Sequence, residues 1–244
     1  MLSGGGMFGA YQAGVWKRIA TLFRPDVVIG TSAGALNAWA IASRCSPEDL
    51  IARWLDPRLG SMLRLKMPWP TSPLFCRTQN LAAGIQNWRY LWTPKTQLGI
   101  VLLAIPNLSL RLARGRQIGP AHLLASCSVP GLVTPVCING AWYCDPCLRD
   151  GLNLWAAAEF GTTRIIAVDV MPALPIGIMQ GFANLAAVAF GSNTPTACNV
   201  RTLTVRPAGA LGTLSEMMNW NRERIRAYVR EGERDASAAV DAGL

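Results

Sequence analysis

Ser32 lies in Gly30-Thr31-Ser32-Ala33-Gly34, a GxSxG pentapeptide that follows the apolar run Val27-Val28-Ile29. A strand-to-helix turn of this kind is tight enough to favour glycine on both sides. It holds the serine hydroxyl in an accessible, strained position from which it can attack a carbonyl carbon. The same pattern also occurs in ordinary turns of chains rich in glycine and serine. Ser32 is therefore a candidate nucleophile, with Gly30 and Gly34 as the glycines of its elbow.

The residues after Ser32 predict a helix. Residues 33–42 are small or apolar, and most of them favour helices, Gly34 being the exception. A helix beginning beneath Ser32 would place backbone NH groups and the positive end of its dipole near the hydroxyl. That arrangement favours negative charge developing at this point.

A second motif, Gly4-Gly5-Gly6-Met7-Phe8-Gly9, precedes a stretch of helical character over residues 10–22. Successive glycines allow backbone NH groups to turn toward a ligand, which suits an oxyanion or a phosphate. A dinucleotide-binding loop would need a preceding strand and an acidic residue at the end of the following strand. Asp26 precedes the run Val27–Ile29 instead of ending it, which disfavours the nucleotide interpretation.

A third segment begins with Ala125-Ser126-Cys127-Ser128-Val129-Pro130-Gly131. It continues through Tyr143-Cys144-Asp145 to the apolar run over residues 164–170. With the glycine loop and the serine elbow, in this order, it resembles the patatin-like phospholipase family. The resemblance is clearest over residues 2–42 and 125–170.

The resemblance implies an α/β fold, in which three α/β/α layers surround a mostly parallel central sheet. It implies a Ser-Asp dyad in which Ser32 is the nucleophile and Asp145 the base, working through an acyl-enzyme. The oxyanion hole would be formed by backbone NH groups of Gly4, Gly5 and Gly6. No metal ion or other cofactor is expected.

Two loops depart from the family pattern. Phe8 stands where the glycine loop usually carries lysine or arginine, which removes a positive charge near the oxyanion site. Pro146 and Cys147 stand where Gly-Gly or Gly-Ala usually follows the aspartate, and the proline biases Asp145 toward an extended backbone. The run Met1-Leu2-Ser3 leaves room only for a very short strand before the glycine loop, unless residues are missing.

Asp150-Gly151 is a second Asp-Gly pair and remains an alternative to Asp145. The unbroken spacing from Asp145 to Gly161 and the strand beyond it favours Asp145. The chain contains a single histidine, His122, in a helical context that predicts a packing or capping role. A serine paired with a carboxylate needs no histidine, so its scarcity is compatible with a dyad.

Cys144 and Cys147 form a CxxC pair, which can be a redox site or half of a metal site. With Cys127 and Cys137 they match no common zinc spacing, so we expect no metal site. The seven cysteines are scattered and odd in number. This disfavours a disulfide framework and predicts reduced thiols and a cytoplasmic location.

A length of 244 residues predicts a single domain over residues 1–244. Strands are expected near residues 27–29, 100–105 and 165–170, where apolar runs are typical of a parallel sheet buried on both faces. No signal peptide is evident at the start of the chain. Residues 171–200 carry no charge, but prolines and amides interrupt them, which predicts a buried or interfacial helix, not a membrane span.

The formal charge of +9 is concentrated in residues 51–116, where Asp56 is the only acidic residue. The basic residues are interleaved with Trp54, Trp69, Trp88 and Trp92. This pattern predicts an inserted docking region or lid for an anionic membrane. The alternative is a solvated basic face with tryptophans in the core. Nucleic acid is disfavoured as a partner, because no recognised binding motif accompanies the charge.

The combined prediction is a lipid acyl-ester hydrolase, a phospholipase, lipase or esterase, that acts on a lipid or acyl-ester substrate and contacts the membrane peripherally. The alternative is a catalytically impaired lipid-binding protein derived from the same fold, since both supporting loops depart from the family pattern.

Overall fold

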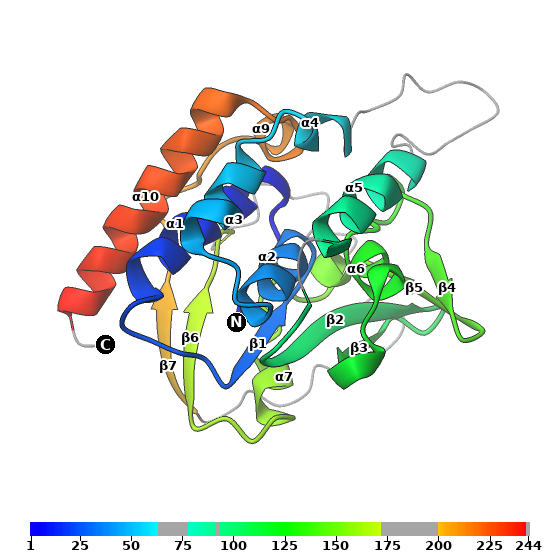
Figure 1. Cartoon of the computed structure of the whole chain (residues 1–244). Coiled ribbons are helices and arrows are strands. Elements are labelled where there is room, and N and C mark those ends of the chain that lie inside the picture. Colours follow the sequence, from blue (N-terminus) through cyan, green and yellow to red (C-terminus); the bar gives the residue numbers. More distant parts are fainter. Residues whose placement is uncertain (63–77, 91–92, 172–199, 243–244) are drawn as a thin grey trace.

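The computed structural model describes residues 1–62, 78–90, 93–171 and 200–242 (Figure 1). The strands are β1 (Val27–Gly30), β2 (Gln97–Ile105), β3 (Ser109–Arg114), β4 (Val136–Ile138), β5 (Ala141–Cys144), β6 (Arg164–Val168) and β7 (Arg201–Val205). The α-helices are α1 (Gly9–Ile19), α2 (Ala33–Ala42), α3 (Pro47–Trp54), α4 (Leu59–Met62), α5 (Thr78–Tyr90), α6 (Pro120–Ser126), α7 (Trp155–Ala158), α9 (Leu214–Met218) and α10 (Arg222–Asp241). Three short 3₁₀ helices are η1 (Gly6–Phe8), η2 (Gly115–Gln117) and η3 (Pro146–Leu148).

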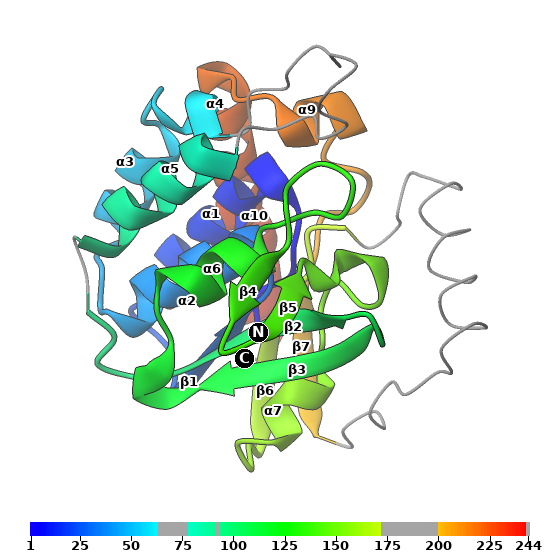
Figure 2. The same cartoon turned by 90° about the vertical axis from the view of Figure 1, so that its right-hand side faces the viewer.

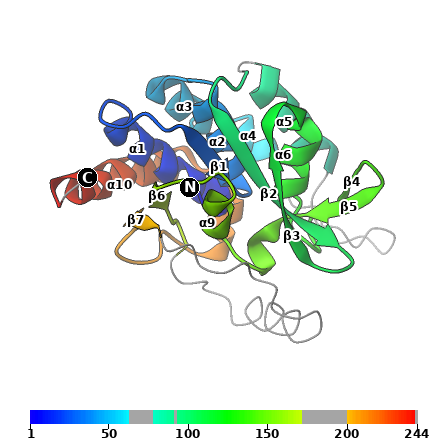
Figure 3. The same cartoon turned by 90° about the horizontal axis from the view of Figure 1, so that it is seen from below.

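The centre of the sheet is parallel. β1 pairs with β2 and β6 pairs with β7 in parallel, and Leu2 bridges both Gly30 and Val168 in the same direction. The amino terminus accordingly lies between β1 and β6 in Figure 3. β3 and β5 pair antiparallel with β2, and β4 extends the sheet from β5. The expected α/β fold with a mostly parallel central sheet is confirmed, and Leu2 alone takes the place of the short first strand.

Each face of the sheet carries its own apolar cluster, because successive strand residues point to opposite sides. Ile100 and Leu102 of β2 join the larger cluster, which includes buried residues of α1, α2 and α10. Val101 and Leu103 join the smaller cluster, which includes α7. Figure 2 shows α1, α2 and α6 above the strands and α7 below them. These are the three layers that the fold class requires.

The three predicted strands and the helices predicted over residues 10–22 and 33–42 are present. β1, β2 and β6 correspond to the expected apolar runs, and α2 has the predicted bounds. α1 ends at Ile19, earlier than the predicted residue 22. The helix predicted within residues 171–200 falls almost entirely outside the described residues. Within the described part of the chain, no helix is both long and apolar enough to cross a bilayer.

The region predicted as a basic, tryptophan-rich insertion needs correction. Most of residues 97–114 form β2 and β3, and β2 pairs with β1, β3 and β5 in the sheet. Trp54 and Trp88 are each 2% exposed, and their rings meet edge to face at 5.7 Å. Both indoles therefore belong to the core, as the alternative interpretation required. Trp69 and Trp92 lie outside the described residues.

Candidate active site

The sheet register brings Ser32 and Asp145 to the same level along one edge of β2, because β3 occupies the other edge. Gly30 of β1 pairs with Ile100, so Ser32, two residues later, comes level with Leu102. Cys144 of β5 pairs with Leu103, and because β5 runs antiparallel, Asp145 also comes level with Leu102. Two residues that are 113 positions apart in the chain therefore lie beside the same residue of one strand.

The serine elbow is strained and closely packed. Ser32 has φ 53° and ψ −124°, a conformation that costs a non-glycine residue about 1–3 kcal/mol and that accumulates at functional sites. A Cβ on Gly30 would overlap the carbonyl of Gly34, and one on Gly34 would overlap the carbonyls of Leu2 and Ser3. Only glycine fits at these two positions. The side chain of Ser32 lies at the amino end of α2 and is 8% exposed.

Asp145 is held by a loop that its neighbour Pro146 helps to form. Asp145 has the extended backbone expected before proline, φ −65° and ψ 127°, and Pro146 opens η3. The Asp145 NH donates to the Ser128 carbonyl at 3.0 Å. The carboxylate oxygen Oδ1 accepts the NH of Cys147 at 2.9 Å. The Asp-Pro-Cys sequence thus replaces the glycines of the family with a capped 3₁₀ turn.

The Asp145 carboxyl is fully buried, and burial raises its pKa from 3.8 to about 6. The Ser32 hydroxyl and Cys147 oppose this effect, because hydrogen bonding favours the ionised form. Oδ2 has no hydrogen-bond partner of good geometry among the described residues. The Ser32 hydroxyl lies close enough to this carboxyl to lower its pKa against the effect of burial.

Two NH groups of the glycine loop, those of Gly5 and Gly6, have no hydrogen-bond acceptor among the described residues. Gly5 has φ 155° and Gly6 has φ 54°, both in the region that favours glycine. Within the described part of the chain, neither NH donates a hydrogen bond. The Gly4 NH donates to the Gly151 carbonyl at 3.0 Å, so Gly4 lies beside Ser32 with its donor already engaged. Phe8 is buried with its ring 5.3 Å from that of Tyr228, so no cation supports this loop from position 8.

A buried amide network fixes the glycine loop against α2. Gln12 Nε2 donates to the Ser3 carbonyl at 2.7 Å. Asn37 Nδ2 donates to the Gly9 carbonyl and to Gln12 Oε1, both at 2.8 Å, and Asn37 Oδ1 accepts the Trp54 Nε1 hydrogen at 2.8 Å. Gln12 and Asn37 are both fully buried. Carbonyls at both ends of the loop are therefore held by side chains.

We expect Asn37→Ala to lower the free energy of unfolding by about 3 kcal/mol, because it leaves the buried partners of Asn37 unsatisfied. Urea denaturation followed by circular dichroism measures the loss. Asn219→Ala is the matched control: Asn219 is exposed and bonds only to Ser215 within its own turn, so a change within about 0.5 kcal/mol is expected. Equal losses in the two variants would contradict a structural role for the network.

Asp150 and His122 have local roles. The Asp150 side chain accepts the NH of Leu152 at 2.9 Å, which closes a turn within its own loop. His122 Nδ1 accepts the Gly119 NH at 3.2 Å, and burial lowers the pKa of its imidazole. The capping role predicted for this histidine is confirmed. The Asp150 carboxylate and the His122 imidazole therefore each accept a backbone NH within their own segment.

The thiols near Asp145 are held in the protonated form. Burial and the neighbouring carboxylate raise the pKa of Cys144 to about 12, and they raise the pKa values of Cys127 and Cys147 well above the usual range. Among the described residues, no three His, Cys, Asp or Glu side chains are grouped so as to hold a metal ion. A protonated, buried thiol is a poor nucleophile.

Two contacts at the elbow were not predicted from the sequence. The Ser32 NH donates to Ser126 Oγ at 2.9 Å. Asn153 Nδ2 donates to the Thr31 hydroxyl at 3.1 Å, and Asn153 has φ 55°. Ser126 lies in a segment that carries the family resemblance, but nothing in the residue types indicates its partner.

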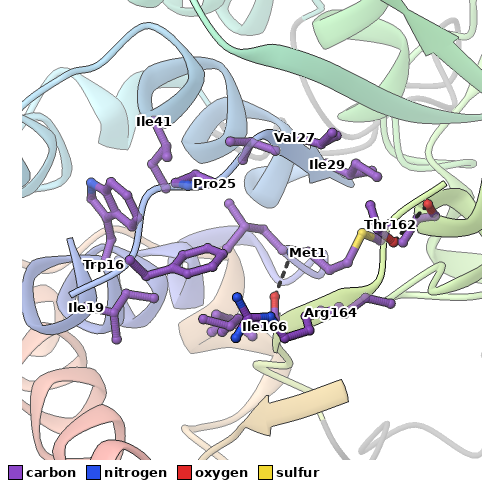
Figure 4. A pocket seen from close by; sticks show the side chains of 16 residues that line it. Met1, Trp16, Ile19, Pro25, Val27, Ile29, Ile41, Thr162, Arg164 and Ile166 are labelled. Carbon is purple, nitrogen blue, oxygen red and sulfur yellow. Dashed lines mark hydrogen bonds between the residues drawn. The ribbon is translucent and has the colours of Figure 1, made fainter. Parts of the chain in front are cut away.

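A separate apolar cavity lies at the opposite end of β1 and β6 (Figure 4). Its lining includes Val27 and Arg164, the first residues of these two strands, whereas Ser32 follows the last residue of β1. The Met1 amino group donates to the Ile166 carbonyl at 2.8 Å beside it. This cavity is therefore distinct from the site around Ser32.

Comparison with known proteins agrees with this geometry. Residues 1–106 match the family model described as patatin-like phospholipase. Among solved structures, VipD from Legionella pneumophila matches with a TM-score of 0.51 at 11% sequence identity, over 99% of this chain and 66% of that protein. At this identity the likeness shows the fold alone. The resemblance to the patatin-like phospholipases is therefore confirmed, with the family match covering residues 1–106.

Proposed function

We propose that this protein hydrolyses lipid acyl esters with Ser32 as nucleophile and Asp145 as general base. The single observation that carries the proposal is that the hydroxyl of Ser32, a residue with a strained backbone, lies beside the buried carboxyl of Asp145, whose pKa is raised to about 6. A base of this pKa is ionised at neutral pH and still able to take a proton. The NH groups of Gly5 and Gly6, which have no acceptor among the described residues, supply an oxyanion hole.

In the proposed reaction, Asp145 accepts the proton of the Ser32 hydroxyl as Oγ attacks the ester carbonyl carbon. The NH groups of Gly5 and Gly6 stabilise the resulting oxyanion, assisted by the amino end of α2. The carboxyl proton then passes to the departing alcohol, which leaves an acyl group on Ser32. A water molecule, deprotonated by Asp145, attacks this acyl-enzyme, and the fatty acid departs as the proton returns to Ser32.

Exposed apolar side chains near the site support a lipid substrate. Trp142 is 51% exposed and lies on β5, three residues before Asp145. Leu214 is 44% exposed and lies on α9, the helix whose Met217 carbonyl abuts Gly6. Apolar residues beside a catalytic pair suit an acyl chain or a lipid surface. The net charge of +9 suits an anionic surface.

The test is incubation of the protein with p-nitrophenyl acyl esters of increasing chain length and with anionic phospholipid vesicles. A fluorophosphonate probe is added in parallel, and the modified residue is located by mass spectrometry. We expect ester cleavage and a single label on Ser32. A protein that binds the vesicles but neither cleaves an ester nor takes the label would instead support the alternative of a catalytically impaired lipid-binding protein.

The pH dependence of kcat/KM is predicted by the pKa of Asp145, which burial raises to about 6. The base must be ionised, so kcat/KM should be level above pH 7 and fall about tenfold for each pH unit below 6. Initial rates on a soluble ester between pH 4.5 and 8.5 give the profile. A midpoint near 4, the value of an exposed aspartate, would argue against a buried base.

A further inference from the structure

Ser126 Oγ connects the nucleophile to the sheet by two hydrogen bonds. It accepts the backbone NH of Ser32 at 2.9 Å and donates its own hydrogen to the Val101 carbonyl at 2.9 Å. The Ser126 side chain is fully buried at the end of α6, so water does not compete for either bond. A hydroxyl has one hydrogen to donate, so its donation to Val101 turns the lone pairs toward Ser32.

The anchor on Val101 matters because of where β2 lies. β2 pairs with β1, which leads into Ser32, and with β5, which leads into Asp145. Ser126 therefore links the nucleophile elbow to the strand with which both β1 and β5 pair. The turn that follows Ser126 also binds the backbone of Asp145, since the Ser128 carbonyl accepts the Asp145 NH at 3.0 Å. One turn after α6 thus contacts the backbone of both members of the dyad.

The elbow needs such an anchor. Ser32 occupies a sparsely populated backbone conformation, which persists only when surrounding contacts hold it. A rotation of the peptide plane before Ser32 would move its Oγ relative to Asp145 and to Gly5 and Gly6. The Ser32 NH lies on this peptide plane and donates to the Ser126 side chain, so this hydrogen bond opposes the rotation.

We infer that Ser126 is a positioning residue for the Ser32 nucleophile, an inference that rests on the proposed hydrolase function. Ser126 acts through the backbone of Ser32 and contacts no substrate. Because the Ser32 NH is engaged by Ser126, it is not available as an oxyanion donor. The elbow is consequently aligned before substrate arrives, which lowers the barrier to attack.

The test is Ser126→Ala, assayed for kcat and KM on a p-nitrophenyl ester and for the rate constant of Ser32 labelling by a fluorophosphonate. Misalignment of the nucleophile should lower kcat and the labelling rate constant by about 10- to 100-fold. KM should stay within about twofold, since no substrate contact is removed. Ser126→Cys has a side chain of similar size that forms weaker hydrogen bonds. Its kcat and labelling rate constant should lie between those of the wild type and Ser126→Ala. This variant provides the measurement if Ser126→Ala fails to fold.

Ser43→Ala is the matched control. Ser43 is also a buried serine whose hydroxyl donates to a backbone carbonyl, that of Trp39 at 2.7 Å, but it lies at the far end of α2. Ser43→Ala should lower the melting temperature less than Ser126→Ala does, because it loses one hydrogen bond and Ser126→Ala loses two. It should leave kcat unchanged. If the role of Ser126 were merely structural, Ser126→Ala would lose stability but keep kcat and the labelling rate constant near the wild-type values, as Ser43→Ala does.

The outcomes separate the inference from the proposed function. An active wild type with equally active and equally fast-labelled Ser126 variants overturns the inference and leaves the hydrolase intact. A wild type that neither cleaves esters nor takes the label overturns the hydrolase proposal, and the positioning role falls with it. Loss of kcat confined to the Ser126 variants, with Ser43→Ala normal, supports both.

Discussion

Ser32→Ala is expected to lower kcat on acyl esters by at least about ten-thousand-fold, to the background rate, because no acyl-enzyme can form without the hydroxyl. The residual rate would come from binding and the oxyanion donors alone. Alanine tolerates the φ of 53° no better and no worse than serine, so the fold should be retained. Steady-state ester hydrolysis and fluorophosphonate labelling measure the loss, and circular dichroism checks the fold.

Asp150→Asn is the control for this series. Asparagine can accept the Leu152 NH through Oδ1 as the carboxylate does, so the turn should persist and activity should stay near that of the wild type. An active Ser32→Ala variant would place the nucleophile elsewhere. If Asp150→Asn were inactive and Asp145→Asn active, the result would identify Asp150 as the general base in place of Asp145.

Asp145→Asn is expected to be inactive and, at pH 8, more stable than the wild type. Burial raises the pKa of Asp145 from 3.8 to about 6, so the folded protein binds this proton more tightly than the unfolded chain does. The carboxyl contributes its full stability below pH 4 and loses it as pH rises through 6. Above pH 6 the buried carboxylate costs about 3 kcal/mol, which asparagine avoids.

Urea denaturation of both proteins at pH 4 and pH 8 tests this prediction. The difference in free energy of unfolding should be near zero at pH 4 and favour Asp145→Asn by up to about 3 kcal/mol at pH 8. Asp150→Asn, in which a partly buried carboxyl is removed, should show no such gain. A variant that is less stable than the wild type at pH 8 would show that Asp145 is not held against a desolvation cost.

Local patterns of the sequence were sufficient for the elements around Ser32, but β3, β4, β5, β7 and α10 were not predicted. The β-branched run before Ser32, the apolar residues after it and the glycines between them predict β1, the elbow and α2, because each depends on near neighbours. The proline after Asp145 likewise predicts the extended backbone found there. The basic, tryptophan-rich region was misjudged in part, since Trp54 and Trp88 fill the core and β2 is a central strand.

By itself, the sequence determined the chemistry of the candidate groups: a serine at a glycine elbow, an aspartate in a proline turn, and a loop of successive glycines. Only the tertiary structure decided which of these meet. The meeting of Ser32 and Asp145 depends on the register of β1 and β5 against β2, and the anchor on Ser126 depends on where α6 ends over the sheet. The raised pKa of Asp145 also depends on burial, which arises from contacts between residues distant in the chain.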